Sequence, residues 1–382
     1  MRGWVPRLRH CLKRPHLQRT ITTHSHERVK VRCGSAGEVA IDLFNLSKFS
    51  ETSPLLIHLP PFSPEQEQEN EIPSIQEFLH SWPVASISYR WRESEGMPTQ
   101  QWPNPCHDVG FAFSWLRENL SPPSPARRSV YVYGSYLGAS LAASLALTES
   151  FPHERFGVRG LVAYNGVYNW TMFLPKHPIR RNIQEDRLAI IEGQHLRELG
   201  LMQRDLFGEP SRMFDPFASA GLLFHSPALY VPDGFGKDAS PVSNTISMFL
   251  TSSSDGSVSS TIRQPRKSSW LFPSRSSTLK IPPTLLLYDS PGAPPWQRFF
   301  SKKPSGHSFF AQAHELAYYM GRSLANVEFK ERVKWDDEIE NWEAEAKSRV
   351  QLSMLGHERE QKDLCSEGAA IVQGWLEDRT SK

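Results

Sequence analysis

The chain has 382 residues, of which 39% are hydrophobic, and its formal net charge at pH 7 is +2. This length can bury one large core or two modest ones. The longest apolar runs fall short of the roughly 18 to 20 residues that cross a bilayer, so we expect a soluble or peripheral protein with no transmembrane segment.

The first 27 residues differ in charge from the rest. Residues 1–26 contain six basic and no acidic side chains, mixed with apolar ones. This composition is typical of a mitochondrial presequence and lacks the continuous apolar run of a secretory signal. A disordered basic tail of a cytoplasmic protein or a short RNA-binding arm are the alternatives, and Pro6 and Pro15 limit any helix here. The remainder has 37 basic and 41 acidic residues, so we expect no nucleic-acid binding by the body of the chain.

Strand-like and helix-like segments alternate from residue 28 onward. "RVKVRCG" and "VAIDLFNL" predict a hairpin, "PLLIHLP" and "VASISYRW" predict buried strands, and a short helix, "IQEFLHSW", lies between these two. The helical spacing of "PCHDVGFAFSWLRENL" precedes the apolar strand at 130–134 and the strand "VRGLVAYNGVY". Such alternation predicts a largely parallel sheet.

The alternation stops near Trp170. Residues 183–207 have helical spacing, and 240–278 are serine-rich, which predicts a mobile loop because little apolar surface is available for burial. A strand at "IPPTLLLYDS", helices at "SFFAQAHELAYYMGRSLANV" and "EIENWEAEAKS", a last strand "RVQLSML" and a closing helix complete the chain.

The stretch "VYVYGSYLGASLAASLAL" (130–147) reads as a strand, a glycine turn and a small-residue helix. That is the pattern of a nucleophile elbow, in which the attacking serine occupies the apex of G-x-S-x-G. Here the apex is Tyr136, between Gly134 and Gly138. We therefore expect Tyr136 to lie at a strand-to-helix junction with unusual backbone angles.

Together these segments resemble the α/β-hydrolase fold, in particular the esterase/lipase group related to hormone-sensitive lipase. The motifs that carry the resemblance include "VASISYRWRESEGMPTQQWPNPCHDVGFAFSWLREN", which precedes the elbow. The resemblance implies an α/β domain formed by 28–175 and 280–380, with a mostly parallel central sheet. It also implies a helical and irregular cap insertion at 176–279.

The nucleophile position departs from the family's pattern. A tyrosine cannot place its oxygen where a serine alkoxide would lie, and an ordinary phenol pKa near 10 makes it a poor partner for a histidine base. Ser135 is the fallback nucleophile, but it precedes the apex and should point away from the crevice. Ser140 lies a helical turn further on, where small residues usually permit close packing.

The oxyanion loop departs as well. One donor is the backbone N–H after the apex, here that of Leu137, and the resemblance places the other in a glycine-rich loop that begins with His58. This chain continues instead with Leu59, Pro60 and Pro61. Proline has no backbone N–H, so these prolines cannot donate to an oxyanion.

The catalytic acid and the histidine base are the other two positions that the resemblance implies. The resemblance puts the acid at Gly292, where no carboxylate exists, and Asp289 is the fallback if the turn is reshaped. His357, after the last strand, occupies the family's histidine position, although a hydrogen-bonded loop residue is the simpler interpretation. His307 is a weaker candidate.

We expect no metal and no cofactor. The four cysteines are widely spaced without a C-x-x-C pair, and neither a phosphate-binding glycine motif nor H-E-x-x-H occurs. The first functional hypothesis is a mitochondrial, catalytically degenerate hydrolase-fold protein that binds a protein partner or an apolar or ester-like ligand. The alternatives are an active carboxylesterase or thioesterase with atypical residues, and a structural or assembly factor of a mitochondrial complex.

Overall fold

The computed structural model describes nine stretches of the chain. They are residues 26–34, 37–61, 75–91, 101–174, 177–180, 185–225, 271–291, 306–330 and 342–381. The presequence-like residues 1–25, most of the serine-rich stretch and Gly292 lie outside them. The predictions made for these positions stay predictions.

The eight strands of the described chain form one sheet in the order β1-β2-β4-β3-β5-β6-β7-β8. The pairs β1–β2 and β2–β4 are antiparallel, and the remaining pairs are parallel. The strands are β1 (His26–Arg32), β2 (Glu38–Phe44), β3 (Leu55–Leu59), β4 (Val84–Ser88), β5 (Arg128–Ser135), β6 (Phe156–Tyr164), β7 (Thr284–Ser290) and β8 (Val350–His357). This arrangement confirms the predicted α/β class with a mostly parallel sheet.

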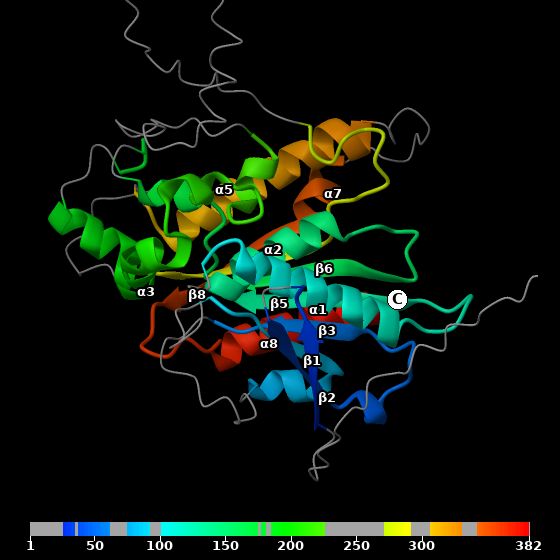
Figure 1. Ribbon diagram of the computed structural model, residues 1–382. Helices are drawn as coiled ribbons and strands as arrows, with labels where there is room; N and C mark the ends of the chain where they lie inside the picture. The colour runs from blue at the N-terminus through cyan, green and yellow to red at the C-terminus, as the bar shows by residue number, and fades with distance from the viewer. Residues whose placement is uncertain are drawn as a thin grey trace, which may run out of the picture.

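Helices cover both faces of the sheet, so most side chains of its central strands are buried (Figure 1). All five residues of β3 are buried, as expected for a strand that is covered on both sides. The helices are α1 (Asn104–Leu120), α2 (Leu137–Thr148), α3 (Glu185–Phe207), α5 (Phe309–Ser323), α7 (Trp342–Arg349) and α8 (Ser366–Thr380). Helix α2 packs on β5 and β6, α5 packs on β7 and β8, and Trp375 of α8 packs edge-on against Tyr131 of β5.

Three predicted helices differ from expectation in detail. The short helix before β4 is a 3₁₀ turn, Glu77–Ser81, and α5 continues into a π-helix, Leu324–Phe329. The helix predicted over 183–207 is broken at Gly193, which has φ 76° and ψ 179°. A Cβ atom at Gly193 would lie 2.4 Å from Oε2 of Glu358, so the break follows from a contact with the far end of the chain.

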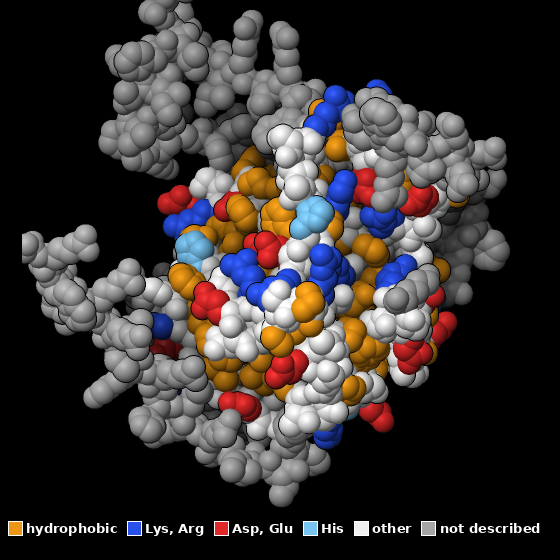
Figure 2. Space-filling model, turned by 90° about the vertical axis from the view of Figure 1, so that its right-hand side faces the viewer, with side chains coloured by type: hydrophobic (Ala, Val, Ile, Leu, Met, Phe, Trp, Pro, Cys, Tyr) orange, Lys and Arg blue, Asp and Glu red, His pale blue; other side chains and the backbone are white. Residues whose placement is uncertain are grey.

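Basic side chains gather near the middle of the face shown in Figure 2, which is the right-hand side of Figure 1. The loops that lead into β5 and β6 reach this side in Figure 1. Arginines in and beside those loops donate to backbone carbonyls: Arg127 to Pro152, Arg155 to Pro122 and Arg159 to Phe151. These cations therefore hold the loops together at the start of the two strands.

The carboxyl ends of β5, β6 and β7 meet at the opposite end of the sheet. Ser135 pairs with Tyr164, and Tyr164 pairs with Leu287. In a parallel sheet such ends are where ligands and catalytic groups are placed. The residues that follow these three strands therefore define the candidate site.

Candidate active site

Tyr136 forms a sharp elbow between β5 and α2. Its backbone angles are φ 51° and ψ −113°, a conformation that non-glycine residues rarely adopt and that confirms the expected junction. Two glycines make the turn possible. A Cβ atom at Gly134 would lie 2.4 Å from the carbonyl oxygen of Gly138, and one at Gly138 would lie 2.2 Å from that of Leu59.

The side chain of Tyr136 is buried at the carboxyl end of β5. Only 2% of its surface is exposed. Its ring meets those of Tyr164, His195 and Phe309 edge-on, with centroids 5.4–5.8 Å apart. Burial raises the pKa of Tyr136, so its hydroxyl stays protonated at physiological pH. The phenol therefore occupies this space as a neutral, packed group.

Asn165 and Asp289 surround the Tyr136 hydroxyl with polar groups. Asn165 Nδ2 donates to the Tyr136 hydroxyl and to Asp289 Oδ2, both at 3.2 Å. Tyr164 donates to the same Oδ2 at 2.5 Å, and the Asp289 backbone N–H donates to Asn165 Oδ1 at 2.8 Å. Asp289 is thus buried and bonded to the end of β6. The structure places the fallback acid near the apex, but its contacts are to Tyr164 and Asn165 and not to a histidine.

His357 lies at the end of β8, and its side chain is exposed. This side chain has no hydrogen bond or ion pair among the described residues. The residue that turns inward is the next one, Glu358, whose carboxylate accepts from the backbone N–H groups of Gln194 at 2.7 Å and His195 at 2.8 Å. A carboxylate here satisfies the first donors of the helical segment that begins after Gly193. The loop after β8 therefore anchors α3.

The loop after β3 turns carbonyl groups toward the elbow. Carbonyl oxygens of Leu59 and Pro60 lie against Gly138, and Pro60 O accepts a hydrogen bond from the Tyr89 hydroxyl at 2.7 Å. Pro60 and Pro61 supply no N–H. Of the two oxyanion donors expected at such a site, only the N–H of Leu137, at the start of α2, has the sequence position that the elbow requires.

His58, which begins this loop, is part of the sheet core. Its Nδ1 lies 3.0 Å from Ser86 Oγ, and its ring stacks on Tyr133 with centroids 5.6 Å apart. Burial lowers the pKa of His58 to about 4, so the ring is neutral at pH 7. His58 therefore packs between neighbouring strands.

The two serines near the apex are both buried. Ser135 Oγ has no hydrogen-bond partner among the described residues. It lies on the same face of β5 as Tyr131 and Tyr133, the face toward α8. Ser140 Oγ donates to the carbonyl of Val167 at 2.5 Å. Neither hydroxyl has a histidine partner among the described residues.

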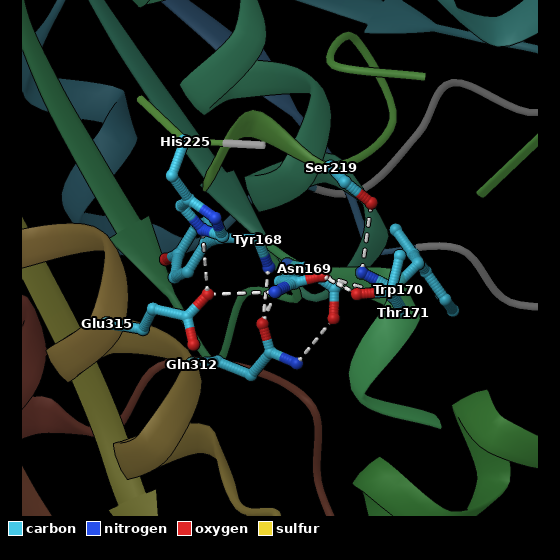
Figure 3. Close-up of polar contacts among 8 residues, drawn as sticks. All are labelled: Tyr168, Asn169, Trp170, Thr171, Ser219, His225, Gln312 and Glu315. Atoms are coloured by element: carbon cyan, nitrogen blue, oxygen red, sulfur yellow. Dashed lines mark hydrogen bonds and ion pairs between the residues drawn. The ribbon is translucent and has the colours of Figure 1, made fainter. Parts of the chain in front are cut away.

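A second polar cluster ties α5 to the segment after β6 (Figure 3). The Gln312 side chain accepts from the backbone N–H groups of Tyr168 and Asn169 and donates to the Asn169 carbonyl. Its Nε2 also lies 2.9 Å from His307 Nε2. His307 Nδ1 lies 3.1 Å from Glu192 Oε1, and burial lowers the pKa of His307. This histidine is fully enclosed, and its contacts are structural.

Sequence reasoning missed Asn165, His195 and Glu358. Asn165 has φ 47°, and an Asn-Gly pair directly after a strand is a recognisable turn signal. The contacts of His195 and Glu358 join positions more than 160 residues apart, for which the local sequence carries no signal.

No group of three His, Cys, Asp or Glu side chains in the described stretches is placed to hold a metal ion. No helix in the part of the chain that the structure describes combines the length and the apolar character that a membrane crossing needs.

The fold of this chain is similar to those of solved esterase structures. The chain is similar to EstE1, a thermostable carboxylesterase from a metagenomic library, with 14% identity, a TM-score of 0.51, and coverage of 96% of this chain and 90% of EstE1. It is also similar to brefeldin A esterase, described as a bacterial homologue of human hormone-sensitive lipase, with 13% identity, a TM-score of 0.47, and coverage of 96% and 79%. No protein-family model matches the chain, and neither does any curated protein. The chain has the α/β-hydrolase fold.

Proposed function

We propose that this chain is a catalytically degenerate member of that fold class, which acts by binding a protein partner or an apolar ligand. The observation that carries the proposal is the buried, neutral tyrosine at the elbow apex. A hydrolase needs a compact nucleophile there, beside a base that can take its proton. Tyr136 fills that position with a packed aromatic ring.

The remaining parts of the site support the same proposal. Asp289 is bonded to Tyr164 and Asn165, while His357 is exposed. A triad needs the acid to orient the histidine and the histidine to reach the nucleophile. Loss of a single oxyanion donor costs roughly 3 to 4 kcal/mol of transition-state stabilisation, and here carbonyl groups lie beside the elbow helix.

A fluorophosphonate probe, which labels activated serines, tests this proposal against the active esterase or thioesterase. We expect no labelling of the purified wild type under conditions that fully label a known serine esterase. Labelling that disappears in Ser135→Ala would contradict the proposal. Ser348→Ala, which removes an exposed hydroxyl on α7, is the matched control and should behave as the wild type does.

We also propose that the protein works in mitochondria. The proposal is supported by the sequence of residues 1–26 alone, with its six basic and no acidic side chains. A fluorescent reporter fused to this segment should enter mitochondria, and neutralising Arg7, Arg9, Lys13 and Arg14 to glutamine should abolish import. A cytosolic signal from the unmodified fusion would contradict the proposal.

A further inference from the structure

A pocket of about 210 Å³ lies at the C-terminal end of α5, away from the elbow. Phe309, at the start of α5, touches Tyr136, whereas the pocket begins at Tyr319. Ten residues of helix separate the two by about 15 Å. The lining residues are Phe224, Leu271, Arg275, Tyr319, Arg322, Ser323, Asn326 and Lys330.

The charged side chains that line this pocket within the described stretches all have the same sign. Arg275, Arg322 and Lys330 contribute three cations, and no described lining residue is a carboxylate. None of these three has an ion pair within the described stretches. The acidic residues of the same helical segment are engaged elsewhere, because Glu315 contacts Asn169 and His225, and Glu328 contacts Arg349. The pocket therefore has an excess of positive charge.

The helical segment presents its polar groups along one face. Tyr319, Arg322, Asn326 and Lys330 follow each other at intervals of three or four residues, which places them side by side on a helix, and Ser323 is adjacent to Arg322. The segment also contains the π-helix Leu324–Phe329, a conformation that is rare and occurs frequently at functional sites. The cations and the amide of Asn326 thus converge on one hollow.

Apolar and aromatic side chains form part of the pocket wall. Phe224 is buried, and Leu271 is 54% exposed. The Tyr319 ring stacks on His225 with centroids 4.2 Å apart, and burial raises the pKa of Tyr319, so its hydroxyl keeps its proton and can donate to an anion. Such a wall suits the organic part of a ligand rather than an isolated inorganic ion.

We propose that this pocket binds a phosphate monoester carried on a small apolar or aromatic group. Two guanidinium groups and one ammonium complement a dianion with three acceptor oxygens better than they complement a monovalent carboxylate. The site goes beyond the proposed function, because it shares no residue with the elbow. The ester is either a small soluble molecule or the headgroup of a lipid such as phosphatidic acid.

A calorimetric titration of the full-length protein with phenyl phosphate tests whether the ligand is a small soluble ester. Phenylacetate, which carries a carboxylate in place of the phosphate, is the comparison. Vesicles of phosphatidylcholine with and without phosphatidic acid, followed by co-sedimentation, test the lipid source. We expect phosphate-dependent binding in at least one arm. Arg322→Gln should weaken it at least about tenfold, since a hydrogen bond to a charged group contributes roughly 1.5–3 kcal/mol.

Arg32→Gln is the matched control, because it removes the same charge from an exposed position on β1. It should leave both arms unchanged. Binding of phenyl phosphate identifies a soluble ligand, and binding to phosphatidic acid vesicles alone identifies a lipid. The proposal is overturned if neither arm shows binding, if phenylacetate binds as tightly as phenyl phosphate, or if Arg32→Gln weakens binding as much as Arg322→Gln does.

Discussion

At the scale of single residues, Tyr136 replaces a small hydroxyl with a large ring while the strained elbow backbone is kept. The φ of 51° is costly for a side chain of this size, so the surrounding packing must hold it. Tyr164, His195 and Phe309 provide that packing, and Asn165 satisfies the hydroxyl. The elbow geometry is therefore formed with a tyrosine at its apex.

His58 predicts a pH dependence of stability. Its pKa is lowered to about 4 in the fold from 6.5, so between these values the unfolded chain binds a proton that the folded chain does not. Stability should therefore fall as the pH drops from about 6.5 to about 4, by up to about 1.4 kcal/mol per pH unit, and this contribution should level off below pH 4.

Urea unfolding at several pH values measures this slope. His58→Gln should reduce it, and half-buried His177, whose pKa is also lowered to about 4, should supply part of what remains. His153→Gln, at an exposed position, is the control for losing an imidazole. An unchanged slope in His58→Gln would show that His58 titrates normally in the fold.

At the scale of elements, the contact between β5 and α2 depends on having no side chain at Gly134. Gly134→Ala would place a Cβ atom 2.4 Å from the Gly138 carbonyl oxygen, and backbone must move to relieve that clash. We expect a loss of more than about 2 kcal/mol in the free energy of unfolding. Gly110→Ala, within α1, meets nothing within 4 Å and should stabilise by up to about 1 kcal/mol. Equal effects of the two changes on urea midpoints would contradict the elbow packing.

The attachment of α3 to the loop after β8 depends on Glu358. Glu358→Ala removes the acceptor for two backbone N–H groups at the start of a helical segment, and we expect it to cost about 1–2 kcal/mol of stability. Hydrogen exchange should show faster exchange of the Gln194 and His195 amides. Glu360→Ala, which removes an exposed carboxylate from the same loop, should change neither quantity. Unchanged exchange of the Gln194 and His195 amides in Glu358→Ala would show that Glu358 does not anchor α3.

The sequence predicted the elements well where the signal was local. Apolar runs and glycine turns placed every strand of the described sheet and the Tyr136 elbow. The break at Gly193 could not be predicted, because it depends on Glu358, 164 positions beyond Gln194. The same limit applies to Gln312, whose bonds to Tyr168 and Asn169 join distant segments. Sequence named Asp289 as a fallback acid, but its bond to Tyr164 required the register of β6 and β7.

At the scale of the whole molecule, the α/β-hydrolase fold carries a buried tyrosine at the apex of its elbow. The proposed function assigns separate defects to the acid, the base and the oxyanion loop, so restoring one part should restore little. Tyr136→Ser would return a hydroxyl to the apex, but Pro60 and Pro61 would still lack N–H donors and His357 would still be exposed. We therefore expect that no single substitution restores hydrolysis.

The rate of p-nitrophenyl butyrate hydrolysis by the wild type and by Tyr136→Ser tests this claim most directly. We predict that both rates equal the buffer background, with circular dichroism used to verify that the variant folds. Hydrolysis by the wild type that is abolished by His357→Ala, but not by His153→Ala, would contradict the account and establish an active esterase.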